Sequence, residues 1–329
     1  MFRNFFKKKS EKSELNFELI FNGEIICSKC DKKLLLNEYT PLTFSKCRYC
    51  NEYCFIPKTI RNYYLYQPLG GGGMGTVYKA VDIETKKLFS VKIIIQDLYS
   101  ESMSIEKIIK EYQIGKSLEN HPNITPTIDL FSVKDNFYLI SEFIEGTRLD
   151  NAVTSDNLPP ASSVMKWTKE IASALQHIYN SGYLYRDLKP QNILVENNTN
   201  SIKIIDFGLA KAIDEPDDGN HIIEGSPEYN ITPERSSFQK EGVYSDIYSL
   251  GMVMYFCYTG KPFFYSDSVH ELVNLHKHKL RFRSVSSKLI NVDPKICEMI
   301  DKMIKKNPME RYTSYDDLIN ELNGIEIKS

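Results

Sequence analysis

The stretch LGGGGMGTVYKA, residues 69–80, constrains the fold most tightly, because four consecutive glycines and a fifth two residues later precede a strand-like run. Glycine lets a backbone bend and approach other atoms where a Cβ would collide. Flexible linkers usually mix glycine with serine and need no large residues after it. Loops that cover phosphates need glycine for close contact with oxygen atoms. The residues around the run therefore decide between a linker and a phosphate-covering loop.

Strand-like runs come before helical runs along the chain. The strand-like runs are residues 63–69, 76–82, 88–95 and 136–143, with one helical stretch, 105–118, among them. The helical runs that dominate after residue 145 are 162–181, 243–259, 268–278, 294–305 and 315–322. A strand-rich part followed by a helix-rich part, without regular βαβ alternation, predicts an α+β fold.

Composition is that of an ordinary globular protein. Hydrophobic residues make up 42% and charged residues 26%, which argues against wholesale disorder. A length of 329 residues exceeds what a single core usually reaches, so more than one folding unit is expected. The net charge of -2 provides no field that would recruit nucleic acid. No run is long and apolar enough for a membrane span, and the first residues lack a signal-peptide pattern, so a cytoplasmic location is expected.

Two C-x2-C pairs, Cys27 with Cys30 and Cys47 with Cys50, are separated by sixteen residues. This spacing is typical of two turns whose four thiolates close around one Zn²⁺ ion. Four protein ligands leave no open coordination position, so the pattern predicts a structural zinc ribbon without metal catalysis. Cys54 is an alternative ligand in place of Cys50. A redox pair and plain reduced cysteines are the competing interpretations.

Three further stretches follow the glycine run in order: LFSVKI, which ends in Lys92, YLYRDLKPQNILV around Asp187, and IKIIDFGLA around Asp206. Together with the glycine run they resemble the eukaryotic-type protein kinase family, in particular its bacterial serine/threonine members. The resemblance covers residues 63–322. It implies a bilobal protein kinase fold. The expected parts are a basic flexible tail at 1–20, a zinc ribbon at 21–58, a small β-rich N-lobe at 63–145 and a large helical C-lobe at 146–322.

The resemblance also implies an ATP site. Lys92 corresponds to the lysine that holds the α and β phosphates, and Glu111 to its buried counter-charge, with Glu106 as the alternative. A buried cation needs such a partner. The other positions that correspond to ATP-contacting residues are Leu69, Gly70, Gly72, Gly75, Val77, Ser90, Ser141, Glu142, Ile144 and Leu194. The glycine run is then a loop over ATP and not a linker.

Catalytic positions follow from the same resemblance. Asp187 corresponds to the group that orients the substrate hydroxyl and accepts its proton, and Lys189 to the lysine that neutralises the γ-phosphate. Asn192 and Asp206 supply the oxygen ligands that Mg²⁺ prefers, with Mn²⁺ as an alternative ion. Phosphoryl transfer needs such positioning and charge neutralisation more than covalent chemistry.

The resemblance therefore implies a serine/threonine protein kinase that transfers the γ-phosphate of ATP to hydroxyl groups of protein substrates. The zinc ribbon is expected to dock a protein partner or to regulate the kinase. The main alternative is a nucleotide-binding pseudokinase or scaffold that acts through the ribbon. A small-molecule kinase on a related fold is a third interpretation. The supporting positions are Asp246, which corresponds to the brace of the catalytic loop, and Glu234 with Arg311, which correspond to a buried ion pair.

Departures from the family pattern concern control of activity. Gly115 stands four residues after Glu111, where a large apolar residue is usual, so this helix is expected to be held less firmly. Residues 208–225 contain no Ser, Thr or Tyr, so no phosphorylation switch is expected there. The acidic residues of that span, candidate partners for Arg186 or solvated side chains, are Asp214, Glu215, Asp217 and Asp218. The segment GSPEYNITPE has one residue more than the usual substrate-docking stretch.

Overall fold

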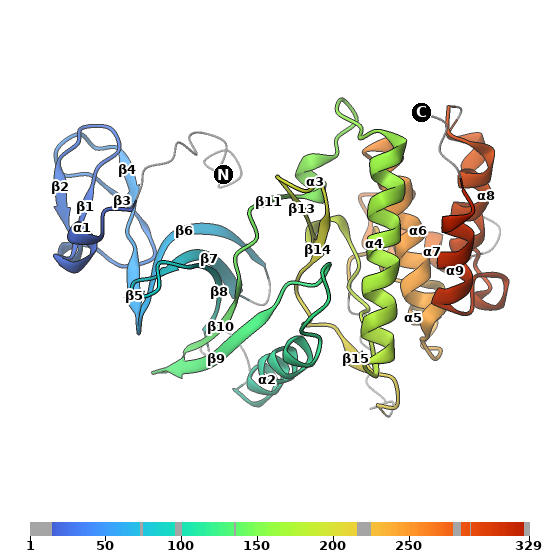
Figure 1. Cartoon of the computed structure of the whole chain (residues 1–329), viewed down its shortest axis with the longest axis horizontal. Coiled ribbons are helices and arrows are strands. Elements are labelled where there is room, and N and C mark those ends of the chain that lie inside the picture. Colours follow the sequence, from blue (N-terminus) through green and yellow to red (C-terminus); the bar gives the residue numbers. More distant parts are fainter. Residues whose placement is uncertain are drawn as a thin grey trace. The chain divides into compact units, whose positions relative to one another are not determined.

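The computed structural model describes residues 15–72, 75–95, 101–134, 136–215, 225–278, 284–289 and 291–325 (Figure 1). The chain forms two compact units, of which the first ends at Ile94 and the second begins at Ile95. The first unit is built from short strands and one long-stranded sheet, and the second carries almost all of the helices. The predicted α+β class is confirmed.

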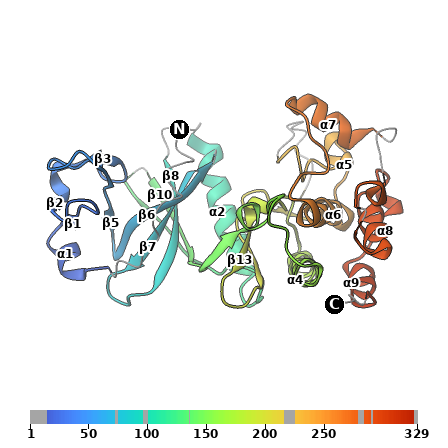
Figure 2. The same ribbon diagram turned by 90° about the horizontal axis from the view of Figure 1, so that it is seen from above.

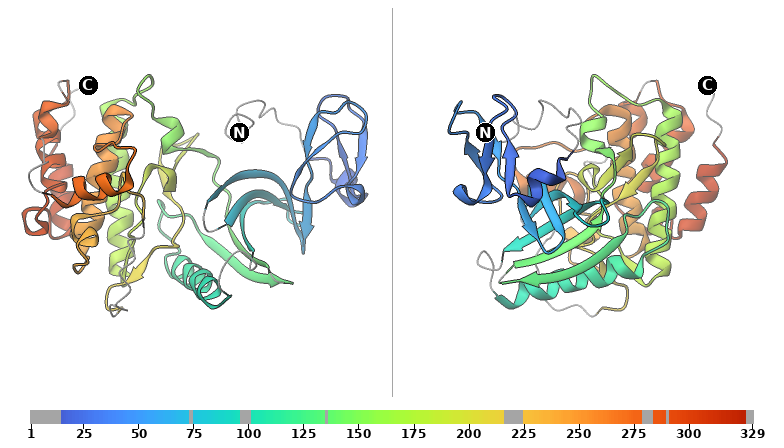
Figure 3. Two further views of the ribbon diagram at one scale, coloured as in Figure 1. Left: turned by 180° about the vertical axis from the view of Figure 1, so that it is seen from behind. Right: turned by 60° about the vertical axis from the view of Figure 1, so that its left-hand side comes forward.

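The first unit begins with a small cysteine module, which we define as residues 24–55. Its two antiparallel hairpins pair Ile25 with Leu34 and Ser45 with Cys54, and they are drawn in dark blue in Figure 3. The elements around these pairs are α1 (Phe17–Phe21), β1 (Glu24–Ile26), β2 (Lys33–Leu35), the 3-10 helix η2 (Leu36–Glu38), β3 (Phe44–Lys46) and β4 (Tyr53–Phe55). Helix α1 begins within the stretch predicted to be a basic tail, of which residues 1–14 lie outside the described residues.

The rest of the first unit is an antiparallel sheet in which β5, β6, β7 and β8 follow one another in space. The strands are β5 (Lys58–Ile60), β6 (Tyr63–Gly72), β7 (Gly75–Asp82) and β8 (Leu88–Ile95). The predicted strands in this part are confirmed, although β6 runs further because its pairing with β7 continues to Gly72 opposite Gly75. Leu65, Ala80 and Val91 form the buried face of the sheet, as the alternation of buried residues along a strand requires.

The cysteine module is packed onto this sheet. The Phe55 ring lies 6.0 Å from the Tyr78 ring, and Lys58 pairs with Leu65 directly after the module ends. The ammonium group of Lys86 lies 3.4 Å from the centre of the Phe17 ring in α1, within the range of a cation–π contact. The module therefore does not hang free of the strands that follow it.

The second unit opens with a helix and a hairpin. The elements are α2 (Glu101–Ser117), β9 (Thr127–Val133) and β10 (Asn136–Glu142). Helix α2 and strand β10 match the predicted helical and strand-like runs closely. Strand β9 was not predicted, and it pairs with β10 from Val133 opposite Asn136, with a register shift between Ile140 and Ser141.

The helices of the second unit form a layered bundle. They are α3 (Leu149–Ala152), α4 (Ala161–Asn180), α5 (Pro233–Ser236), α6 (Val243–Thr259), α7 (Val269–Lys277), α8 (Pro294–Met303) and α9 (Tyr315–Asn323). Helix α6 is buried over most of its length and lies between α4 and α8 (Figure 2). The apolar stretch that forms α6 is too short for a membrane span. Its central position in the bundle explains why it is apolar. All five predicted C-terminal helices are confirmed.

Short strands and turns surround the segment between α4 and α5. They are β11 (Gly146–Arg148), β12 (Tyr183–Leu184), η4 (Pro190–Asn192), β13 (Ile193–Glu196), β14 (Ile202–Ile204) and β15 (Lys211–Ala212). Strand β13 pairs with both β11 and β14, and β12 pairs with β15. Two 3-10 turns, η6 (Val285–Ser287) and η7 (Pro308–Glu310), join the last helices. Within the described residues, no helix combines the length and apolarity that crossing a membrane requires.

Candidate active site and metal site

Helix α6 fixes the backbone of the segment from Tyr185 to Asp187 through hydrogen bonds. The backbone N–H groups of Tyr185 and Arg186 donate to the Asp246 carboxylate at 2.9 and 2.8 Å. Arg186 has a φ of 67°, a left-handed conformation that costs energy in a non-glycine residue and needs support from its surroundings. Burial raises the pKa of Asp246 to about 6 against the lowering effect of these two donors. The predicted role of Asp246 as a backbone brace is confirmed.

The Asp187 carboxylate is only 5% exposed and accepts hydrogen bonds on both oxygens. Lys189 Nζ lies 2.9 Å from Oδ1 and 2.8 Å from Oδ2. Asn192 Nδ2 donates to Oδ2 at 2.7 Å, and Asn230 Nδ2 donates to Oδ1 at 2.8 Å. Burial raises the pKa of Asp187 above its usual range, and Asp206 adds to this effect while Lys189 opposes it. This carboxylate is a buried hydrogen-bond acceptor with a fixed orientation.

Asn192 and Asp206 lie on either side of the β13–β14 hairpin. Asn192 ends η4, and its backbone oxygen accepts from the Ile205 N–H at 3.0 Å. Asp206 follows β14 with a φ of 68°, and its Oδ1 accepts from the Gly208 N–H at 3.0 Å. Leu194 on β13 is half-buried and pairs with Lys203. The hairpin therefore fixes the backbone of the two residues predicted to bind Mg²⁺.

Arg186 contacts an acidic residue that the sequence patterns did not single out. Its guanidinium lies 2.9 Å from Glu241, and Arg235 binds the other oxygen of Glu241 at 2.7 Å. Burial alone would raise the pKa of Glu241, but Arg235 and Arg186 together lower it to about 2. Glu215 instead pairs with Lys110 at 2.6 Å.

The other acidic candidates of that span are Asp214, Asp217 and Asp218. Asp214 is exposed, and Asp217 and Asp218 lie outside the described residues. Among the described residues, Glu241 places an acidic side chain at Arg186 from the segment before α6.

The predicted buried ion pair is confirmed. Arg311 donates to the two oxygens of Glu234 at 2.9 and 3.0 Å, and both side chains are almost fully buried. Arg311 also donates to the Tyr244 carbonyl oxygen at 2.9 Å. The pair joins the N-terminus of α5 to the turn before α9.

Helix α2 fits closely around Gly115. A Cβ at this position would lie 2.2 Å from Thr127 Oγ1 and 3.5 Å from the Phe207 ring. Thr127 and Phe207 are both buried. The expectation of a loosely held helix took only the missing side chain into account, whereas the neighbours of Gly115 occupy that space.

The remaining candidates of the second unit lie on α2 and at the end of β10. Glu111 is buried on α2 whereas Glu106 is exposed, which favours Glu111 as the counter-charge position because a buried carboxylate needs a partner. Ser141 and Glu142 end β10, and the Glu142 N–H donates to the Pro126 carbonyl oxygen at 3.0 Å. Ile144 is buried just after the strand.

The glycine run forms the β6–β7 hairpin of the first unit. Gly70 pairs with Val77, and Val77 pairs with Lys92 on the next strand. Gly75 has a φ of 130°, and a Cβ there would lie 2.3 Å from the Ile93 carbonyl oxygen, so only glycine fits. The structure thus brings the hairpin, Val77 and Lys92 together within one sheet.

The other candidates of this unit lie on or beside the same strands. Ser90 pairs with Lys79, and Leu69 is exposed on β6. Residues 73 and 74 lie outside the described residues.

The four predicted metal ligands come together in the cysteine module. The Sγ atoms of Cys27, Cys30, Cys47 and Cys50 all lie within 4.8 Å of one another. Cys27 Sγ is 3.6 Å from Cys50 Sγ, and Cys30 Sγ is 3.7 Å from Cys47 Sγ. A tetrahedral Zn²⁺ with bonds of about 2.3 Å separates its sulfurs by about 3.8 Å. The geometry of the group therefore fits a zinc ion, and Cys54 is not a member of it.

The two cysteine turns repeat one backbone pattern. The N–H of Cys27 donates to Lys32 O at 2.9 Å, and that of Cys47 donates to Glu52 O at 2.7 Å. In each turn the residue after the second cysteine, Asp31 or Asn51, has a φ between 53° and 59° and donates back to the first cysteine. Asn and Asp tolerate this left-handed conformation, so the local sequence accounts for the sharp turns.

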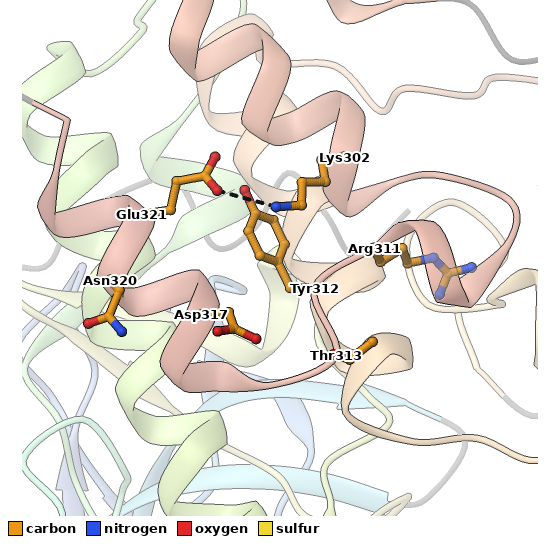
Figure 4. A pocket seen from close by; sticks show the side chains of 7 residues that line it. All are labelled: Lys302, Arg311, Tyr312, Thr313, Asp317, Asn320 and Glu321. Atoms are coloured by element: carbon orange, nitrogen blue, oxygen red, sulfur yellow. Dashed lines mark hydrogen bonds and ion pairs between the residues drawn. The ribbon is translucent and has the colours of Figure 1, made fainter.

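A separate polar cavity of about 330 Å³ lies between α8, α9 and the turn before α9 (Figure 4). Lys302 stands over the Tyr312 ring at 3.8 Å and pairs with Glu321 at 3.3 Å. The cavity is lined by Lys302, Arg311, Tyr312, Thr313, Asp317, Asn320 and Glu321. None of these is a predicted ATP or catalytic residue, and the exposed ion pair at its mouth is of the ordinary surface kind.

A β-rich part followed by a helical bundle, with a buried carboxylate, lysine and amide cluster between α4 and α5, defines a protein kinase domain. The family described as "Protein kinase domain" matches residues 63–322, and the chain belongs to this family. The match covers most of the chain, so the fold and the family resemblance of the sequence agree.

Curated relatives include bacterial serine/threonine kinases. The chain is 31% identical over 259 residues to serine/threonine-protein kinase PrkC of Bacillus subtilis, covering 78% of this chain and 39% of that protein. It is 28% identical over 287 residues to serine/threonine-protein kinase pkn3 of Myxococcus xanthus, covering 83% and 51%. It is 29% identical over 273 residues to serine/threonine-protein kinase PknB of Mycobacterium leprae, covering 81% and 43%. The chain thus spans about two fifths to one half of the length of these relatives.

Proposed function

We propose that this chain is a serine/threonine protein kinase that transfers the γ-phosphate of ATP to hydroxyl groups of protein substrates. The observation that carries the proposal is the buried Asp187 carboxylate, oriented by Lys189 and Asn192 at 2.7 to 2.9 Å. The names of the curated relatives support the serine/threonine class. Membership of the protein kinase family supports ATP as the phosphate donor.

Each catalytic residue of the second unit has a separate role in the proposed reaction. The substrate hydroxyl oxygen bonds to the γ-phosphorus while the bond from that phosphorus to the β–γ bridging oxygen breaks, and ADP leaves. Asp187 orients the hydroxyl and takes its proton, because its raised pKa suits a general base more than that of a solvated aspartate does. Lys189 neutralises charge on the transferred group. Asn192 and Asp206 offer the oxygen donors that Mg²⁺ or Mn²⁺ prefers, and the metal when bound neutralises phosphate charge.

The remaining site residues hold the nucleotide in this proposal. The β6–β7 hairpin supplies Gly70, Gly72 and Gly75 for close approach to phosphates, and Val77 packs on the adenine. Lys92 binds the α and β phosphates, with Glu111 as its counter-charge. The remaining proposed nucleotide contacts are Leu69, Ser90, Ser141, Glu142, Ile144 and Leu194.

A labelling assay tests the proposal. The full chain is incubated with radiolabelled ATP, Mg²⁺ and a generic protein substrate, beside Asp187→Asn and the control Asp156→Asn. Asp156 is an exposed residue of the same unit. We expect label in the substrate with the wild type and the control, and a loss of about 10²-fold or more with Asp187→Asn. Label that is equal in all three would contradict the role of Asp187, and no label in any would favour the pseudokinase.

We infer that the cysteine module is a structural zinc ribbon. The support is the group of four sulfurs at the spacing that a tetrahedral Zn²⁺ requires. Basic side chains of Lys29 and Arg48 stand near it and pair with Glu52 and Glu38. Elemental analysis of the purified chain tests this, with one zinc per chain expected and none in Cys27→Ser/Cys47→Ser.

A nucleotide-binding scaffold that acts through the ribbon is the second candidate. The exposed apolar side chains Phe21, Ile26 and Tyr49 around the cysteine module favour a protein partner for the ribbon. The enzyme and the scaffold are separated by the same labelling assay, because a scaffold binds ATP without transferring label. We propose a cytoplasmic location for either function, since free ATP and unpaired thiols both belong to a reducing compartment.

A further inference from the structure

Asn230 contacts the carboxylate of Asp187, although neither the motifs nor the family resemblance assigns it a role. Its side chain is 0% exposed, and Nδ2 donates to Asp187 Oδ1 at 2.8 Å. A buried amide beside a buried carboxylate is an energetically consequential contact, because hydrogen bonds to charged groups are stronger than neutral ones.

The other end of the Asn230 amide is also occupied. Its Oδ1 accepts from the backbone N–H of Ser226 at 2.6 Å, and its own backbone N–H donates to Ser226 O at 3.1 Å. A side chain at this position must therefore accept on one side and donate on the other. Only an amide of this length does both, since aspartate has no donor and alanine has neither group.

Gly225 leaves the space that the amide needs. It has a φ of 131°, and a Cβ there would lie 2.3 Å from Asn230 Oδ1. The neighbours of Asn230 anchor the turn from the other direction. Tyr229 packs edge-on against Phe256 of α6 at 5.9 Å, and Ile231 is buried. The packing of the turn therefore holds the Asn230 amide in place.

The Ser226 hydroxyl has a different partner. It donates to the Glu228 carboxylate at 2.8 Å. Asn230 lies within the segment GSPEYNITPE, which is one residue longer than the usual docking stretch. The contact to Asp187 is therefore supplied by the part of the chain in which this sequence departs from the family pattern.

We propose that Asn230 is a positioning residue for phosphoryl transfer, which holds the Asp187 carboxylate in the orientation that accepts the substrate proton. The inference rests on the proposed kinase function. Asn230 touches neither the substrate nor the nucleotide in this account, and it acts only through Asp187.

The Asp187 carboxylate is held from two parts of the chain. Lys189 and Asn192, which follow it in sequence, bind Oδ2 at 2.8 and 2.7 Å. Asn230 binds Oδ1 at 2.8 Å from the segment before α5. Removal of the Asn230 donor leaves this second side without its amide, and a carboxylate at position 230 replaces the donor by a group that can only accept. Both changes should therefore lower kcat without changing how ATP is bound.

The test measures kcat and KM for ATP in the labelling assay at neutral pH. For Asn230→Ala we expect a fall in kcat of about 10-fold to 10²-fold and a KM for ATP within about twofold of wild type. Asn230→Asp should lose at least as much, because a carboxylate has no donor for Asp187. The matched control is Asn123→Ala, a buried amide that donates to Ile202 O at 2.9 Å and does not contact Asp187. Its kcat and KM should coincide with those of the wild type.

A kcat that is unchanged in both Asn230 variants, while the wild type is active, would overturn the inference and leave the kinase function standing. If neither variant folds, Gly225→Ala decides, because its Cβ displaces the amide without removing it. A fall in kcat at unchanged KM for ATP in that variant supports the inference, and wild-type values overturn it. A wild type that transfers no phosphate would instead refute the proposed function, and the inference with it.

Discussion

The cysteine module and the helical bundle bury different kinds of atoms. The interior of the module consists of Leu34 and the thiols of Cys27, Cys47 and Cys54, with a few half-buried neighbours. The bundle buries a continuous apolar cluster that runs from Ile114 to Leu322. A small module without an apolar core needs a metal or another crosslink to be stable, whereas the bundle does not. One chain therefore combines two independent sources of stability.

The largest expected effect comes from metal removal. Metal binding supplies on the order of 10 kcal/mol to small zinc modules, so a strong chelator should unfold residues 24–55. Hydrogen exchange should then rise throughout the module while α6 keeps its protection. Cys257→Ala is the matched control, since Cys257 is buried in the bundle outside the sulfur group, and its zinc content should equal that of the wild type. Unchanged hydrogen exchange in the module after chelation would show that the module is stable without metal.

Substitution of a buried charged residue should lower the stability of the bundle more than substitution of an exposed one. Glu234→Gln leaves Arg311 buried without its full counter-charge and should lower the free energy of unfolding by about 3 to 5 kcal/mol. Lys302→Met removes an exposed pair with Glu321 and should cost less than about 1 kcal/mol. Denaturant unfolding of both variants measures the difference. Equal losses would mean that burial of the Glu234–Arg311 pair does not matter to stability.

Acid should weaken the bundle through Glu241. Its folded pKa of about 2 lies below its ordinary value of 4.5, so its contribution is fully present above pH 4.5 and is lost as the pH falls toward 2. The contribution at neutral pH is about 3 kcal/mol. Unfolding free energies measured from pH 6 to pH 2 should fall less steeply in Glu241→Gln than in the wild type. Parallel curves would argue that Arg186 and Arg235 do not depend on this carboxylate.

The smallest effect is expected at Gly115. Helix propensity alone predicts that Gly115→Ala stabilises α2 by about 1 kcal/mol. The close contact with Thr127 instead predicts a loss of about 1 to 3 kcal/mol from overpacking. Thermal unfolding gives the sign, and the double variant Gly115→Ala/Thr127→Ala should recover part of the loss. A gain in the single variant would show that the helix can move away from β9.

Local patterns predicted the long elements and the ligand groups well. The periodicity of α4, α6, α8 and α9 and the C-x2-C spacing are written in neighbouring residues, so they are readable without tertiary structure. Strands β11, β12 and β15 have only two or three residues and carry no periodicity of their own. Such strands form only because tertiary structure brings their partners beside them, β13 beside β11 and β15 beside β12.

The contacts of the candidate site that the sequence did not predict share one cause. Asn230 meets Asp187 and Glu241 meets Arg186 across more than forty residues of chain, so no local pattern announces them. Gly115 looked like a defect because only its own helix was considered, and Thr127 lies on a strand that was not predicted. The one signal that could have led to Asn230 was the extra residue in its segment.

The proposal that this kinase domain transfers phosphate through Asp187 is tested most directly by identifying the modified amino acid. The wild type and Asp187→Asn are incubated with MgATP and a protein substrate, and the phosphorylated residues are located by mass spectrometry. We expect phosphoserine or phosphothreonine with the wild type and a loss of about 10²-fold or more with Asp187→Asn, at unchanged ATP binding. Undiminished phosphorylation by Asp187→Asn, or phosphate found on other residue types alone, would contradict it.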